Sequence, residues 1–305
     1  SQENAQHILE LLNIIFRSND NVKINAATAE IDQLLKNEGS IFDLFLILQQ
    51  CPDNTFRRVT LILISQYICK LILAYSSEQI QQIKEMLISL LQNEEDIQCR
   101  ISLCDLINVL VSDKKLSFQW AEVYEYANQM LQNENLFTTG LYLWGLIFNT
   151  LTEEIKIRVS PFLIETCQQA LGIDNKESRV YGTYLLQTVL WETCSKIDYT
   201  QVAESFVPIL IQVLKKVFLV DQDIWEANSL VKNISEILSV PEVFEAFVIK
   251  FAQLGIEIMS QEDLPLELRV KAYGLIENDN SSGFAKLLDQ DFKIVQNNLI
   301  LFINM

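Results

Sequence analysis

Residues 52–73 read PDNTFRRVTLILISQYICKLIL. The stretch begins with the turn residues Pro-Asp-Asn and two arginines, and it then becomes apolar around nearly the whole circumference of a helix. Such a helix either spans a membrane or is enclosed by neighbouring helices. Ser65, Gln66 and Lys70 interrupt it, and a span needs about 20 mostly apolar residues. The stretch therefore favours a helix packed between others, and we expect no membrane insertion.

The composition supports a helical protein. Half of the 305 residues are apolar and 21% are charged, which is typical of a folded chain. The chain has only 8 glycines and 5 prolines. Sheets joined by tight turns and glycine-rich cofactor loops both need more of these residues. We therefore expect an all-α protein with no cofactor.

The formal net charge of -17 limits the possible partners. An acidic surface repels nucleic-acid phosphates and anionic membrane surfaces, so we expect neither as a ligand. The same surface would attract a basic protein, because opposite fields steer encounter. The alternative is an acidic, soluble surface with no electrostatic task.

The chemistry-bearing residues do not indicate an enzyme or a metal protein. Six cysteines stand in apolar helical contexts and none has CxxC spacing, so we expect free thiols, a reducing compartment and no zinc. His7 is the single histidine, and it stands near the start of a helix, where we expect it to be exposed. The sequence contains no P-loop, GxGxxG or HExxH motif. We therefore predict no catalysis.

A polar turn followed by an arginine and an apolar helix recurs along the chain, at 52–57, 95–100, 175–179 and 266–269. The four arginines, at 57, 100, 179 and 269, lie 43, 79 and 90 residues apart. Similar turns at 133–135 and 221–223 divide the two longer gaps. A period of about 40 to 47 residues with two helices per unit is typical of HEAT or armadillo repeats.

The pattern predicts seven helix pairs, each with a first (A) and a second (B) helix, and one further helix from residue 283. The predicted pairs are 4–17 with 22–36, 40–51 with 54–74, 77–93 with 96–111, 116–133 with 135–151, 155–172 with 176–195, 199–219 with 221–239, and 241–260 with 266–277. We therefore predict one α-solenoid of about seven HEAT repeats over residues 1–305.

A solenoid explains the stretch at 52–73, because a B helix packs on its own A helix and on the B helices before and after it. We expect Ser65, Gln66 and Lys70 to mark its exposed strip. The predicted core residues of this helix are Val59, Ile62, Leu63, Tyr67, Leu71 and Ile72.

The end of the sequence, QDFKIVQNNLILFINM, has no capping residue or helix breaker. Solenoids normally finish with a polar repeat, whereas Leu299, Ile300, Phe302 and Ile303 would leave an apolar edge open. We therefore expect further repeats to follow in a longer protein.

The segment NVKINAATAEIDQLLKNEGSIFDLFLILQQCPDNTFRRVTLILISQYI, residues 21–68, resembles the amino-terminal region of the importin-beta (karyopherin-beta) family. The resemblance is nearest to the importin-four and importin-five branch. Weaker similarities follow in the family's order at 96–106, 119–122, 206–210 and 285–305. The segment NDNSSG at 278–283 departs from the family, which usually continues a helix there.

The resemblance implies a nuclear transport receptor that shuttles between cytoplasm and nucleus. In this family Ran-GTP binds inner B helices of the amino-terminal repeats and displaces basic cargo, and phenylalanine-glycine (FG) nucleoporins bind between outer A helices. The alternative is a generic HEAT scaffold for a cytosolic protein complex, because the fold alone does not fix the function.

The resemblance also suggests residues for each partner. Lys23, Gln66, Asp105 and Asn108 fall at the family's Ran-binding positions, although Ser65 stands where a basic or amide residue is common. Glu236 and Glu277 are the candidates for basic cargo, and Phe162, Phe244 and Phe247 are the candidates for nucleoporin pockets. The alternative is that the polar residues are solvated helix positions and the phenylalanines are core residues.

Overall fold

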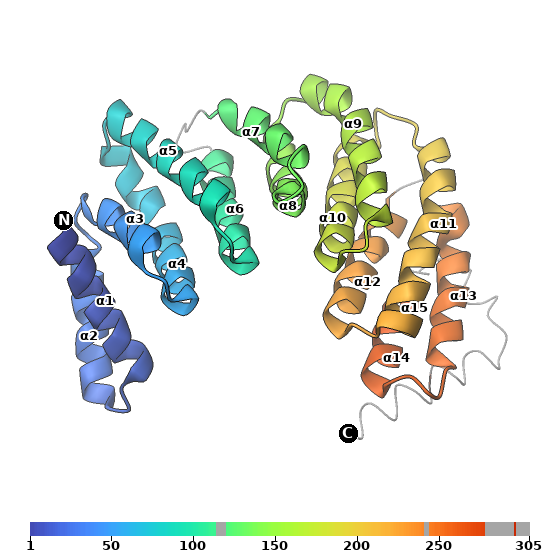
Figure 1. Cartoon of the computed structure of the whole chain (residues 1–305). Coiled ribbons are helices and arrows are strands. Elements are labelled where there is room, and N and C mark those ends of the chain that lie inside the picture. Colours follow the sequence, from blue (N-terminus) through green and yellow to red (C-terminus); the bar gives the residue numbers. More distant parts are fainter. Residues whose placement is uncertain (114–119, 241–243, 278–295, 297–305) are drawn as a thin grey trace. The chain divides into compact units, whose positions relative to one another are not determined.

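The computed structural model describes residues 1–113, 120–240, 244–277 and 296, and the described part is helical with no strand. Its helices pack into two compact units, Ser1–Gln132 and Asn133–Met305. Figure 1 shows antiparallel helix pairs within each unit. The prediction of an all-α, HEAT-type helix-pair architecture is confirmed, and one solenoid over 1–305 stays a prediction.

In the first unit, consecutive helices pair and the pairs pack on one another. α1 contacts α2 and α3, α3 contacts α4 and α5, and α4 contacts α6. The helices are α1 (Gln2–Arg17), α2 (Asn21–Leu34), α3 (Ser40–Gln50), α4 (Asn54–Leu71), α5 (Ser77–Asn93), α6 (Ile97–Ser112) and α7 (Glu122–Leu131).

The second unit repeats this arrangement. α10 packs on its own A helix α9 and on the B helices α8 and α12, and the A helices α9 and α11 also touch. The helices are α8 (Phe137–Ile147), α9 (Glu153–Gly172), α10 (Lys176–Thr193), α11 (Thr200–Lys216), α12 (Ile224–Leu238), α13 (Val248–Met259), α14 (Leu266–Ala272) and α15 (Gly274–Glu277).

In five repeats, the polar turn between the A and B helices supplies a helix cap, whereas α8 and α14 begin after Leu136 and Pro265 without a side-chain cap. Asp20, Asp53, Asp96 and Asp223 cap α2, α4, α6 and α12, and Asn175 caps α10, each through a side-chain oxygen that accepts a backbone N–H of the first turn. Each cap contributes about 1 kcal/mol to stability. The recurrent turn in the sequence is therefore the recurrent start of the B helices.

In the first unit, the two arginines after the α4 cap connect α4 to the start of the next B helix, α6. Arg57 of α4 forms an ion pair with the buried Glu94 just before α6. Arg58 pairs with Asp96, the α6 cap, at 2.9 Å. These contacts fix how the second helix pair stacks on the third.

Arg179 of α10 has the same role in the second unit. Its Nε and Nη2 donate to Glu226 of α12 at 2.6 and 3.0 Å, and both side chains are buried. Asp221 lies 3.5 Å from the same guanidinium. Lys176 pairs with Asp223, the α12 cap, at 3.0 Å.

The B helices begin within about three residues of their predicted starts. Two A helices, α7 and α13, begin at Glu122 and Val248, and their predicted starts at 116 and 241 lie outside the described residues.

The core side of α4 was predicted wrongly. Its buried residues are Thr60, Leu61, Ile64 and Ile68, whereas Ile62 is 54% exposed. Of the other residues in the predicted core set, Ile72 is buried, and Val59, Leu63, Tyr67 and Leu71 are half-buried. A helix that is apolar all round carries no periodic signal that fixes which side is buried. Gln66 and Lys70 lie on the exposed strip as predicted, and Ser65 is half-buried.

Several predictions fall at the end of the chain. The helix from 283, the NDNSSG segment and the apolar edge at 299–303 lie outside the described residues. Of Glu277, only the backbone at the end of α15 is described.

Three observations on the described part concern membranes, disulfides and metals. No helix in it is long and apolar enough to cross a membrane. All six cysteines are free thiols. Within the same ranges, no group of three or more His, Cys, Asp or Glu side chains is placed to hold a metal ion.

Candidate functional site

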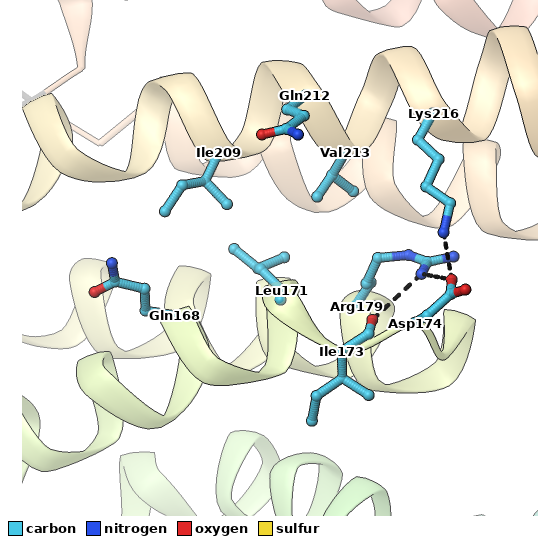
Figure 2. Close-up of a pocket in the computed structure, with 10 residues that line it drawn as sticks. Gln168, Leu171, Ile173, Asp174, Arg179, Ile209, Gln212, Val213 and Lys216 are labelled. Carbon is cyan, nitrogen blue, oxygen red and sulfur yellow. Dashed lines mark hydrogen bonds and ion pairs between the residues drawn. The ribbon is translucent and has the colours of Figure 1, made fainter.

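A slot of about 450 Å³ lies between the A helices α9 and α11 of the second unit. Figure 2 shows side chains from the two helices facing each other across it. The lining residues are Gln168, Leu171, Gly172, Ile173, Asp174, Arg179, Ile209, Gln212, Val213 and Lys216.

The floor of the slot is apolar. Leu171 of α9 and Val213 of α11 are buried, and Ile209 is half-buried. Ile209 and Val213 are four residues apart, which places them on one face of α11. Ile173, just after α9, is partly exposed at the edge. The slot can therefore receive an apolar side chain.

Two amides stand on the rim. Gln168 and Gln212 are exposed, and they come from the two opposite helices. An amide side chain offers two N–H donors and a carbonyl acceptor. The rim can therefore bind the main chain of an extended peptide while a side chain enters the slot.

An ion-pair network closes one end of the slot (Figure 2). Asp174 accepts a hydrogen bond from Lys216 of α11 and one of 3.2 Å from Arg179 Nη1. These bonds, first from Lys216 and then from Arg179, lower the pKa of Asp174 below its usual value. Because Arg179 is itself held by Glu226, this end of the slot is tied to the stacking of α10 on α12.

The Ran-binding candidates lie on the B helices of the first unit. Lys23 of α2, Gln66 of α4 and Asp105 of α6 are exposed. Asn108 is half-buried, and its Oδ1 accepts a 2.7 Å hydrogen bond from Ser112. Since α4 and α6 pack together, Gln66 and Asp105 belong to neighbouring helices.

The other candidates are more scattered. Glu236 is exposed in the last turn of α12. Phe162 of α9 is 46% exposed but is not among the residues that line the slot. Phe247 is half-buried beneath the Lys250 ammonium, 5.2 Å from its ring centre. Phe244 is fully buried, so it is a core residue, and we remove it from the nucleoporin candidates.

The slot residues were not singled out from the sequence. The available signal was an apolar stripe on α9 and α11 wider than one packing face needs, with Ile209 and Ile173 at its edges. That signal does not show that two helices 40 residues apart would leave a gap between them.

No protein-family model matches the chain, and no curated protein matches it. Solved structures of Kap121p match along nearly the whole chain. Kap121p bound to RanGTP is 18% identical with a TM-score of 0.66, and the match covers 96% of this chain and 27% of Kap121p.

Two other complexes give the same result. Kap121p bound to Ste12p is 15% identical with a TM-score of 0.69, and the match covers 98% of this chain and 29% of that one. Kap121p bound to Nup53p is 14% identical with a TM-score of 0.68, and the match covers 97% of this chain and 29% of that one.

These matches confirm the fold as the HEAT-repeat solenoid of a karyopherin. The matched chain in these structures is Kap121p, a karyopherin. The chain spans between a quarter and a third of the length of Kap121p.

Proposed function

We propose that this chain is part of a nuclear transport receptor that binds Ran-GTP, basic cargo and FG nucleoporins. The observation that carries the proposal is a karyopherin fold over 96% of the chain, matched in a complex of Kap121p with RanGTP. Shuttling between cytoplasm and nucleus follows from the same proposal. Its place nearest the importin-four and importin-five branch stays a prediction.

The slot between α9 and α11 is the proposed nucleoporin site. An FG motif offers an aromatic ring next to a glycine, in an extended main chain. Burying a phenylalanine ring removes about 150 to 250 Å² of surface from water, which matches a small apolar slot. Gln168 and Gln212 are placed to bind the flanking main chain. Glycine beside the ring lets that main chain approach the rim closely.

The B helices of the first unit are the proposed Ran site. Gln66 and Asp105 lie exposed on neighbouring helices, and Lys23 lies at the start of α2. The net charge of -17 favours a partner with a basic surface. Such a contact weakens with salt, because exposed charges are screened over about 10 Å at 0.1 M ionic strength.

Titration with a fluorescent FG peptide tests the nucleoporin part of the proposal. Ile209→Asp places a carboxylate at the slot and is expected to weaken binding about ten-fold or more, a loss of about 1.4 kcal/mol. Val220→Asp is the matched control, because Val220 is 72% exposed and does not line the slot.

Equal binding by both variants would place the peptide elsewhere and refute the slot assignment. No binding by the wild-type chain would remove the nucleoporin part. Together with a failure to bind Ran-GTP, that result would favour the generic scaffold.

A further inference from the structure

An exposed tryptophan stands on the B helix of the fifth pair. Trp191, in the last turns of α10, is 40% exposed. Its Nε1 donates a 3.0 Å hydrogen bond to the backbone carbonyl of Glu236 in α12. One edge of the indole is therefore anchored while part of the ring stays accessible. The hydrogen bond already orders the ring in the free protein. Binding a ligand to the ring therefore costs little further conformational entropy.

The residue that anchors the indole also carries a carboxylate. The exposed Glu236 side chain belongs to the residue whose carbonyl holds the indole. Within the described part of the chain, this carboxylate has no hydrogen-bond or ion-pair partner. Glu236 is also in the last turn of α12, where helix carbonyls concentrate partial negative charge. An aromatic ring, a carboxylate and a helix C-terminus all favour a cation.

Other charged groups belong to the same surface. Lys232 lies one turn before Glu236 on α12 and is exposed. On α10, Glu192 follows Trp191 but is already paired with Lys156 at 2.5 Å. Gln187, one turn before Trp191, is half-buried and can bind a peptide main chain. The unpaired carboxylate on the residue that anchors the indole is therefore that of Glu236, and the Lys232 ammonium on the same helix would repel a bound cation.

We propose that Trp191 and Glu236 form a binding site for one arginine or lysine side chain of an extended basic peptide. The cation stacks on the indole and forms an ion pair with the Glu236 carboxylate. This inference rests on the proposed function, since a basic segment of cargo would be the ligand. It adds Trp191 as the residue that fixes the position of the basic side chain.

The test uses the whole 305-residue chain and a labelled peptide of alternating arginine and serine, with glutamine in place of arginine as the control peptide. Trp191→Ala is expected to weaken binding of the basic peptide about five-fold, and Glu236→Gln by a similar factor. Lys232→Gln is expected to strengthen it about two-fold, because a like charge is removed. The glutamine peptide should not respond to these changes.

Two further variants separate stacking from simple apolar contact. Trp191→Phe keeps an aromatic face and should retain more affinity than Trp191→Leu, which keeps only apolar surface. Equal binding by wild type, Trp191→Leu and Glu236→Gln would overturn the proposal, and so would equal binding of the two peptides.

Titration of the same samples with the FG peptide distinguishes a failure of the Trp191–Glu236 site from a failure of the proposed function. If FG peptide binds and the basic peptide does not, the site is refuted while the proposed function stands. Basic-peptide binding that depends on Trp191 and Glu236 without FG binding would support the site and count against the slot.

Discussion

The Arg179–Glu226 ion pair offers a sharp test of how the repeats are held together. Glu226 is fully buried, and it receives two hydrogen bonds from the guanidinium. Glu226→Gln keeps the volume but removes the charge and one good acceptor. A hydrogen bond to a charged group contributes about 1.5 to 3 kcal/mol. Asp174 and Asp221 still neutralise Arg179, so we expect a loss of about 2 to 3 kcal/mol.

The control is an ion pair of the same type on the surface. Lys215 and Glu257 lie 3.1 Å apart, and both are about half-exposed. Surface pairs contribute about 0 to 1 kcal/mol, so Glu257→Gln should have little effect. Replacing both buried partners with apolar residues, as in Arg179→Met with Glu226→Leu, should cost less than the two single changes together.

Urea unfolding followed by circular dichroism measures these differences, with the slope m compared between variants to show that the unfolded states are alike. Hydrogen exchange at α10 and α12 shows whether the loss is local to their interface. A Glu226→Gln variant as stable as Glu257→Gln would refute the claim that this pair holds the fifth helix pair on the sixth.

Three further predictions use other features of the fold. The backbone N–H of Glu226, and then Lys176, lower the pKa of Asp223 below its usual value. The stability that its charge adds is therefore present above the ordinary carboxyl pKa and is lost as the pH falls through the lowered pKa. Urea midpoints of wild type and Asp223→Asn should differ at neutral pH and converge at the acid end of this titration. Gly255→Ala should lower the free energy of unfolding by about 1 to 3 kcal/mol, because the added Cβ would lie 3.0 Å from the backbone carbonyl oxygen of Ala272. Gly172→Ala is the control, because its Cβ would meet open space, and it should leave the stability unchanged or raise it in thermal unfolding. Cys167 is buried and its pKa is raised, so maleimide should label it only after unfolding. The partly exposed Cys194 should react with maleimide in the native protein. Labelling of Cys167 before Cys194 would contradict the packing of α9.

Much of the fold could be predicted because the residues of the polar turns cap the B helices and, in some repeats, contact the next repeat. An Asp or Asn cap sets where a B helix begins. In α4 and α10, an arginine four residues after the cap, Arg57 or Arg179, also reaches the next repeat. These residues recur at a fixed period and are few enough to recognise. The starts of the B helices were therefore predicted within about three residues.

The buried side of a nearly all-apolar helix could not be predicted. In α4, Thr60 lies in the core because its hydroxyl donates a 2.7 Å hydrogen bond to the carbonyl of Phe56, while Ile62 faces out. Polarity alone predicts the reverse. The core side is set by packing against α3 and α6, which the sequence of α4 does not contain.

The sequence likewise predicted some of the candidate site residues and missed others. Single exposed residues such as Gln66 and Glu236 could be placed from the helix pattern. The slot could not, because it depends on how far apart α9 and α11 lie. Trp191 was missed because a tryptophan in an apolar helix is ordinarily a core residue, and only the hydrogen bond to Glu236 shows its orientation.

The most direct test of the transport-receptor account is a titration of this chain with Ran loaded with GTP or with GDP, at low and at physiological salt. The account predicts binding to the GTP form alone, weaker at the higher salt, and reduced by Gln66→Ala and Asp105→Ala but not by the slot variant Ile209→Asp. Equal affinity for the two nucleotide forms, or no binding to either, would contradict it.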